Sequence, residues 1–183
     1  MARIALVTGG CRSGKSAHAQ RVAELLPPCR AYVATSPVTD PEMAARIEAH
    51  RHSRRDRGWD TIEEEIDLEG VFSRGIAYNV MLVDCVTLWV NNLMYRGELV
   101  GGAIGEKEVA SRCAAMLDAA HACPASVIFV TNEVGLGIVP ENAQARLYRD
   151  LIGRANQIIA ARADWVVLVS CGIPLDLKGT NWS

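Results

Sequence analysis

Short apolar runs alternate along the chain with longer stretches of helical character. The apolar runs have the length and continuity of buried strands, and they cover residues 4–7, 31–35, 79–83, 126–131 and 165–170. The longer stretches are rich in helix formers or repeat apolar residues every three or four positions, over residues 17–26, 86–95, 106–122 and 141–163. This alternation predicts an α/β fold, a mostly parallel sheet with helices on both faces.

Other segments are less regular. Residues 59–66 are acidic and partly alternating, which fits a short strand or the edge of the sheet. A loop over residues 36–41 leads into a further helix, with Asp40 as its N-cap and Pro41 at its first position. The continuous apolar run at 165–170 predicts an interior strand, and a polar tail is expected after residue 174.

The first strand leads directly into a glycine-rich loop. The residues after Thr8 fit the spacing of a phosphate-binding P-loop: Gly9, Gly10, Cys11, Arg12, Ser13, Gly14, Lys15 and Ser16. In such a loop the amides and the following helix N-terminus bind phosphate, the lysine reaches the outer phosphates and the serine holds Mg²⁺. A tight strand-to-helix turn alone does not account for the lysine and serine at this spacing. The loop therefore predicts a P-loop (RecA-like) fold that binds a nucleoside triphosphate.

Polar residues also follow two of the other predicted strands. Asp84 ends the strand at 79–83, which is the Walker-B position of a Mg²⁺-holding acid, although an N-cap of the next helix is a competing role. Asn132 and Glu133 end the strand at 126–131. Open α/β sheets bind ligands at the carboxyl ends of their strands. We therefore expect these side chains to converge with the P-loop on one crevice.

Basic residues gather between positions 46 and 57. They are Arg46, His50, Arg51, His52, Arg54, Arg55 and Arg57. A solvated helix face is the ordinary interpretation of such a run, and cations that face the bound phosphates are the alternative. The same two interpretations apply to Arg146 and Arg149, while the glycine-containing loop at 135–140 is either a lid or simple turns.

The composition limits the class of protein. The 183 residues suit one domain, 1–183, and 50% hydrophobic with 22% charged residues is ordinary for a globular protein. A net charge of −2 argues against non-specific nucleic-acid binding. The apolar runs are too short to span a membrane, and the start lacks a signal-peptide pattern, so a cytoplasmic location is expected.

The six cysteines form no CxxC pair, which favours neither a zinc site nor a redox motif. In a reducing compartment we expect them to be small buried hydrophobic residues. Cys11 is the exception to watch, because a thiol inside the phosphate loop is open to alkylation.

Taken together, these motifs resemble the bifunctional adenosylcobinamide kinase/adenosylcobinamide-phosphate guanylyltransferase family of cobalamin biosynthesis. The resemblance covers nearly the whole chain and rests on residues 7–16, 32–35, 40–47 with His50, 59–64, 82–89, 130–142 and 172–174. A P-loop alone is shared by many unrelated enzymes. The segment Val130-Thr131-Asn132-Glu133-Val134-Gly135 and the histidine-bearing helix are more specific. Two departures, Cys11 where alanine is common and Glu65 where proline is expected, remove no group that the chemistry requires.

The resemblance implies two reactions that use GTP and ATP. ATP or GTP phosphorylates the aminopropanol hydroxyl of adenosylcobinamide. His50 then attacks the α-phosphate of GTP, and the guanylyl-histidine passes GMP to adenosylcobinamide phosphate. It also implies that Ser16 and Asp84 hold Mg²⁺ or another divalent cation. The nucleotide would contact Thr35, Glu63 and Asp84 as well as the P-loop, and the protein would form a homotrimer.

Alternatives remain open on the sequence. Without the resemblance, His50 is best interpreted as an exposed helix histidine. With the resemblance, His50 is the first candidate for the guanylylated residue, His52 is the second and His18 is the weakest. A single-function P-loop kinase of another small alcohol or nucleoside is the second hypothesis for the function. A nucleotide-binding switch that transfers no group is the third.

Overall fold

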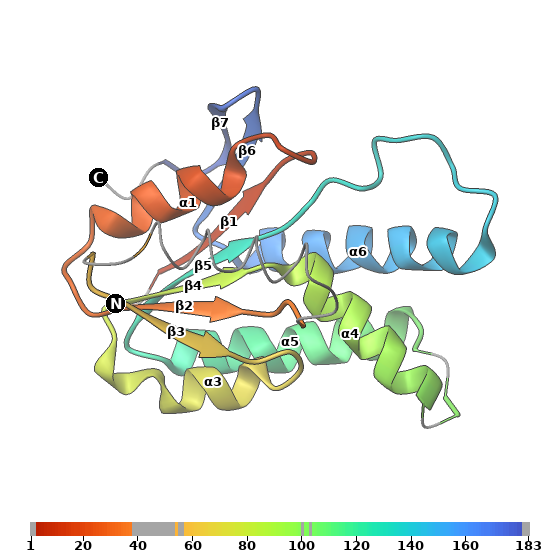
Figure 1. The fold of residues 1–183 in the computed structure, drawn as a ribbon, viewed down its shortest axis with the longest axis horizontal. Helices are drawn as coiled ribbons and strands as arrows, with labels where there is room; N and C mark the ends of the chain where they lie inside the picture. The colour runs from red at the N-terminus through yellow and green to blue at the C-terminus, as the bar shows by residue number, and fades with distance from the viewer. Residues whose placement is uncertain (1–2, 38–53, 55–56, 100, 103, 181–183) are drawn as a thin grey trace.

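A computed structural model of the chain describes residues 3–37, 54, 57–99, 101–102 and 104–180. A seven-stranded sheet runs through this part of the chain, in the order β3-β2-β4-β5-β1-β6-β7 (Figure 1). The strands are β1 (Ile4–Thr8), β2 (Arg30–Ala34), β3 (Trp59–Glu63), β4 (Val80–Asp84), β5 (Ser126–Val130), β6 (Trp165–Ser170) and β7 (Ile173–Lys178). Neighbouring strands are parallel from β3 to β6, and β7 is antiparallel to β6.

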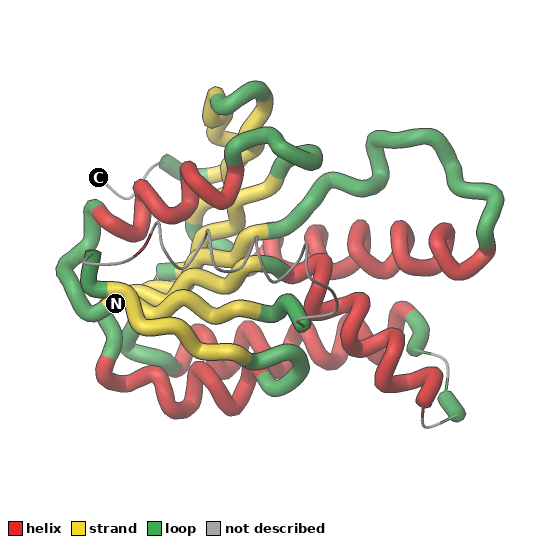
Figure 2. Tube along the Cα trace, viewed as in Figure 1, coloured by secondary structure: helices red, strands yellow, loops and turns green. Residues whose placement is uncertain are grey.

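Helices cover both faces of the sheet (Figures 1 and 2). The helix α1 (Lys15–Glu24) lies on one face. The other face carries α3 (Leu68–Arg74), α4 (Val86–Leu99), α5 (Glu106–Ala122) and α6 (Ala143–Arg162), and the short 3-10 helix η1 (Gly75–Ala77) follows α3. The predicted α/β class, the mostly parallel sheet and the helices on both faces are confirmed.

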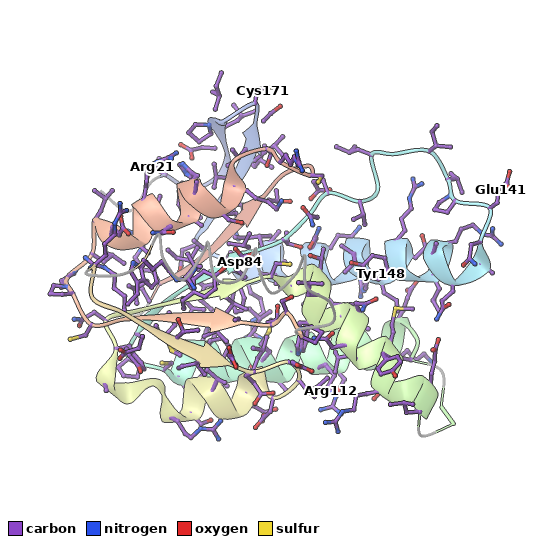
Figure 3. The ribbon with its side chains drawn as sticks, in the orientation of Figure 1. Arg21, Asp84, Arg112, Glu141, Tyr148 and Cys171 are labelled. Carbon is purple, nitrogen blue, oxygen red and sulfur yellow. The ribbon has the colours of Figure 1, made fainter. Side chains whose placement is uncertain are left out.

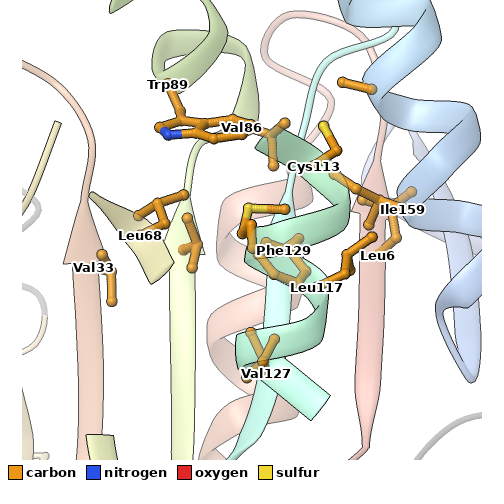
Figure 4. Packing of buried hydrophobic residues seen from close by; sticks show 14 of the residues in the cluster. Leu6, Val33, Leu68, Val86, Trp89, Cys113, Leu117, Val127, Phe129 and Ile159 are labelled. Carbon is orange, nitrogen blue, oxygen red and sulfur yellow. The ribbon is translucent and has the colours of Figure 1, made fainter. Parts of the chain in front are cut away.

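The core consists of two apolar layers, one on each side of the sheet. Alternate strand residues enter opposite layers: Leu6 belongs to the layer that contains residues of α3, α4, α5 and α6, whereas Val7 belongs to the layer that contains residues of α1. Figure 4 shows the larger layer, in which Trp89 and Phe129 lie among residues of the helices. The predicted strands read as continuous apolar runs because both of their faces are buried. Trp89 is 2% exposed and its Nε1–H donates to the Ile66 carbonyl, which confirms it as a core residue.

Element bounds agree with the sequence patterns to within a few residues, and residues 59–63 form the expected short edge strand. Two elements were missed. The expected polar tail contains β7, whose side chains are all exposed and whose backbone pairs with β6. The helix α3 was not predicted, although Asp67 caps it by accepting a hydrogen bond from the Gly70 amide at 2.8 Å. The predicted helix at residue 40 lies outside the described residues.

The cysteine expectation is partly wrong. Cys85, Cys113 and Cys123 are buried, as expected of small hydrophobic residues, but Cys11, Cys29 and Cys171 are exposed. Cys11 lies in the P-loop and Cys171 in the turn between β6 and β7, so loop geometry places them at the surface. Among the described helices, none is long and apolar enough to cross a membrane.

Candidate active site

A cavity of about 540 Å³ opens at the carboxyl ends of β1, β2, β3 and β4. Most of the predicted nucleotide contacts line it: Cys11, Arg12, Ser13, Gly14, Lys15, Ser16, Glu63 and Asp84. Further lining residues that the sequence did not single out include Tyr32, Ser36, Thr61, Leu88 and Tyr148. Gly9 and Gly10 belong to the same loop but do not line the cavity. The structure thus brings together the P-loop and the Asp84 strand, as parallel strand ends require.

The P-loop is held in shape by short contacts. The Ser13 amide donates to the Gly10 carbonyl at 3.3 Å, and the Lys15 ammonium donates to the same carbonyl at 3.2 Å. A Cβ at Gly9 would overlap the carbonyl oxygen of Val169, so no larger residue fits there. Gly14 has φ +92°, in the left-handed region that favours glycine. The two glycines of the motif are therefore required by close packing and by backbone conformation, respectively.

Asp84 lies at the end of β4 and lines the cavity; Figure 3 labels it at the sheet. Its Oδ2 accepts a hydrogen bond from the Tyr32 hydroxyl at 3.0 Å. Burial and the Asp84 carboxylate raise the pKa of Tyr32 well above its usual value, so the phenol stays a donor. The guanidinium carbon of Arg54 lies 3.5 Å from the centroid of the Tyr32 ring. Tyr32 therefore connects an acid and a cation that both line the cavity.

Arg54 and Arg57 separate the two interpretations of the basic run. Arg54 is 4% exposed and lines the cavity, which supports a cation that faces phosphate. Arg57 is exposed and its Nη1 lies 3.5 Å from Glu24, as on an ordinary solvated surface. Arg46, Arg51 and Arg55 lie outside the described residues.

Arg146 and Arg149 bind the neighbouring loop. Arg146 donates to the carbonyls of Pro140 and Glu141, and Arg149 donates to those of Gly135 and Gly137. These hydrogen bonds connect the loop to α6. Both guanidinium groups therefore bind backbone carbonyls of the chain in this structure.

A polar network supports the end of β5. The Thr8 hydroxyl donates to Glu133 Oε1 at 2.8 Å, and Asn156 Nδ2 donates to the Asn132 carbonyl at 3.1 Å. Asn132 lines the cavity, whereas Glu133 does not. The end of β5 therefore lies beside the P-loop, as predicted. Asn132 lines the cavity there, and Glu133 connects the end of β5 to the end of β1 through its hydrogen bond with Thr8.

Thr35 is fully buried and does not line the cavity. Its hydroxyl donates to the Cys85 carbonyl and accepts from the Cys85 amide, both at 2.8 Å. These bonds hold the end of β2 against the residue that follows Asp84. The predicted nucleotide contact of Thr35 stays a prediction, and its neighbour Ser36 is the residue at the cavity.

The predicted nucleophile His50 and its substitute His52 lie outside the described residues. His18 is described, and it lies in α1 with its ring centroid 6.0 Å from that of Trp165. It is 8% exposed and does not line the cavity. Burial and the nearby Arg21 lower the pKa of His18, so its imidazole is neutral near pH 7. This placement gives His18 a packing role.

The buried His18 should make folding stability sensitive to acid. Because its pKa is lowered in the folded state, the unfolded chain binds the proton more readily, and stability is lost as the pH falls through about 6.5. We expect the free energy of unfolding to fall less between about pH 7.5 and about pH 5.5 in His18→Leu than in the native chain. Urea titrations measure this difference. The exposed His121→Leu variant is the matched control for the loss of a histidine; an unchanged slope in His18→Leu would contradict the assignment.

Ser16 and Asp84 are chemically suited to a divalent cation. Both line the cavity and both offer oxygen, the ligand that Mg²⁺ prefers. Tyr32 engages one carboxylate oxygen of Asp84, which orients the other. The described residues contain no group of three or more His, Cys, Asp or Glu that could hold a metal by themselves. A site of this kind suits a cation that is completed by water and nucleotide phosphates.

Comparisons with known proteins agree with this geometry. The sequence profile of the CobU family, cobinamide kinase / cobinamide phosphate guanyltransferase, matches residues 5–177. The bifunctional adenosylcobalamin biosynthesis protein CobU of Escherichia coli (strain K12) is 42% identical over 187 residues, covering 94% of this chain and 98% of that protein. The CobU protein of Salmonella typhimurium is 42% identical over 183 residues, with the same coverage. The CobP protein of Pseudomonas aeruginosa is 39% identical over 175 residues, covering 95% and 96%.

Fold and cavity define a P-loop nucleotide-binding α/β protein. The profile match and the identities show that the chain belongs to the CobU family. It is accordingly a bifunctional cobinamide kinase and cobinamide phosphate guanylyltransferase of adenosylcobalamin biosynthesis, an enzyme that uses nucleotide substrates. The family resemblance predicted from the motifs is confirmed. The single-function kinase and the nucleotide switch are set aside, because the family carries both transfer activities.

Proposed function

We propose that one domain carries both transfers and that both use the P-loop cavity. In the first, the hydroxyl oxygen of adenosylcobinamide bonds to the γ-phosphorus of ATP or GTP, the bond to the bridging oxygen breaks, and a nucleoside diphosphate and a proton are released. The observation that supports this is the cavity that gathers Lys15, Arg54 and Asp84 around the P-loop. Phosphoryl transfer depends on positioning and on compensation of charge, which these groups supply.

In the second transfer, an imidazole nitrogen of His50 bonds to the α-phosphorus of GTP and pyrophosphate leaves. A phosphate oxygen of adenosylcobinamide phosphate then bonds to the same phosphorus, the P–N bond breaks, and adenosylcobinamide-GDP is formed. A neutral imidazole is a competent nucleophile near pH 7, and the covalent intermediate divides one difficult displacement into two. The assignment of His50 rests on its position in the family motif at residues 40–50.

The experiment that tests this function uses GTP labelled at the α-phosphate. The protein is incubated with Mg²⁺ and labelled GTP, and the label is mapped by peptide analysis. We expect acid-labile label on His50 and release of pyrophosphate. No label on any histidine, combined with intact phosphoryl transfer to adenosylcobinamide, would discard the covalent mechanism and leave the kinase half.

Mg²⁺ is proposed to bind at Ser16 and Asp84. When bound, the cation would neutralise phosphate charge in the transition state. The role of the chain is to hold two oxygen ligands at the cavity wall, with Tyr32 fixing the carboxylate.

The substitution Asp84→Asn should raise the Mg²⁺ concentration needed for half-maximal kinase activity about 10- to 100-fold, because an amide is a weaker ligand than a carboxylate. Kinase assays over a Mg²⁺ series measure the shift. Asp150→Asn, an exposed change on α6, is the matched control and should keep the native Mg²⁺ dependence. An Asp84→Asn enzyme with the native Mg²⁺ requirement would remove Asp84 from the metal site.

A homotrimer and a cytoplasmic location are part of the proposal. Leu136, Ile138 and Val139 on the loop before α6 are 83%, 96% and 62% exposed, and such apolar exposure supports contact with another subunit. Sedimentation equilibrium measures the number of subunits. The proposed cytoplasmic location is supported by the need of both transfers for ATP and GTP, which the cytoplasm supplies.

A further inference from the structure

A second groove, of about 300 Å³, lies between α4 and the beginning of α6. Its residues come from the second half of α4, from the Asn142 cap of α6 and from the first turns of α6. Tyr148 lines both this groove and the nucleotide cavity, so the two adjoin at this side chain. Figure 3 shows Tyr148 on α6, to one side of Asp84.

The groove has a fixed frame and a mixed polar and apolar lining. Gln144 of α6 donates to the Glu98 carboxylate of α4, which joins its two walls. The Tyr148 hydroxyl donates to the Thr87 carbonyl at 3.2 Å. Asn91 and Tyr95 are both exposed and lie four residues apart, hence on one face of α4. The lining therefore presents amide groups, which donate and accept hydrogen bonds, beside an aromatic face.

The chemistry of the acceptor suits this lining. Cobinamide is a flat macrocycle edged with carboxamide side chains, and one of these carries the amino alcohol whose hydroxyl receives the phosphate. The nucleotide cavity contains the P-loop, and only the hydroxyl of the acceptor has to reach the phosphates bound there. The rest of the macrocycle can then lie on a surface that adjoins the cavity.

We propose that the α4–α6 groove binds the edge of the corrin macrocycle, with Asn91 bonding its carboxamides and Tyr95 packing against the ring. This inference rests on the proposed kinase function. The helix α4 starts two residues after Asp84, and its second half lines the groove.

A second neighbouring pocket is less suited to the acceptor. It adjoins the nucleotide cavity at Ser36 and Glu63 and contains Glu64 and Glu65. Its carboxylates accept hydrogen bonds and its Ser36 and Arg96 side chains donate them, but its described lining holds no aromatic side chain. The α4–α6 groove offers hydrogen-bonding groups beside the aromatic side chain of Tyr95.

The test uses Tyr95→Ala, which removes the aromatic face, and Asn91→Trp, which fills the groove. Each should raise the KM for adenosylcobinamide in the kinase step at least about tenfold. The KM for ATP should stay unchanged, as should labelling of the protein by GTP without corrinoid, because neither needs the groove. Leu25→Ala, an equally exposed apolar change at the end of α1, is the matched control and should behave as the native enzyme.

The outcomes separate the groove from the proposed function. A native enzyme that does not phosphorylate adenosylcobinamide would overturn the proposed function and this inference with it. An active native enzyme together with a native KM for adenosylcobinamide in both variants would overturn the groove alone. An equal rise in the KM for ATP would also overturn the groove as the corrin site. A change in sedimentation with no change in the KM for adenosylcobinamide would overturn it too, and would assign the groove to a subunit contact.

Discussion

Replacing Lys15 with alanine should abolish both transfers by weakening productive triphosphate binding. Lys15 is 9% exposed, lines the cavity and donates to the Gly10 carbonyl at 3.2 Å. Its ammonium is thus held within the P-loop, where it can reach the outer phosphates and stabilise charge as it moves onto the leaving group. Loss of one such group typically costs about 100- to 1,000-fold in rate. We expect at least that loss in kcat/KM for phosphoryl transfer and for guanylylation.

The Lys15→Ala experiment needs a fold control and a charge control. Thermal unfolding should show an intact protein, because the apolar layers of the core do not include Lys15. Lys107→Ala removes an exposed cation from α5 and should leave both activities unchanged, so net charge is matched. If Lys15→Ala transferred phosphate at the native rate, the cavity would not be the triphosphate site.

The sequence predicted those parts of the site that depend on residues close together in the chain. The P-loop is recognisable because glycines, lysine and serine have fixed spacing between a strand and a helix. Asp84 is recognisable because it ends a strand that is apolar on both faces. Parallel pairing of β4 with β5 and of β5 with β1 then brings these two strand ends to one edge. A short pattern and one topological rule were sufficient.

The remaining features depend on contacts between distant residues. Arg54 and Arg57 belong to one basic run, yet only the packing of Arg54 on Tyr32 places it at the cavity. Thr35 looks like a site residue by position, but its hydroxyl is engaged by Cys85, 50 residues away. The strand β7 forms by pairing with β6, with Asp176 accepting a hydrogen bond from Trp165 at 2.7 Å. None of these contacts has a periodic pattern in the sequence.

Replacing His50 with alanine should separate the two activities. Without the imidazole no guanylyl-histidine can form, so GMP transfer should fall at least about a thousandfold, as is usual when a covalent nucleophile is removed. Phosphorylation of adenosylcobinamide should continue, because that step takes the γ-phosphate directly and has no covalent intermediate on the protein. The measurement follows both products in one assay, with ATP labelled at the γ-phosphate and GTP labelled at the α-phosphate.

His52→Ala is the matched control for His50→Ala, since it removes a histidine two residues away in the same basic run. It should keep both transfers and still become labelled at His50. The reverse result, with label and transfer lost only in His52→Ala, would move the nucleophile to His52 and keep the covalent mechanism. Native GMP transfer in both variants would instead exclude both histidines. Because His18 is buried beside Trp165 and does not line the cavity, it could not replace them, and GMP transfer would then proceed directly from GTP or through a nucleophile other than these histidines.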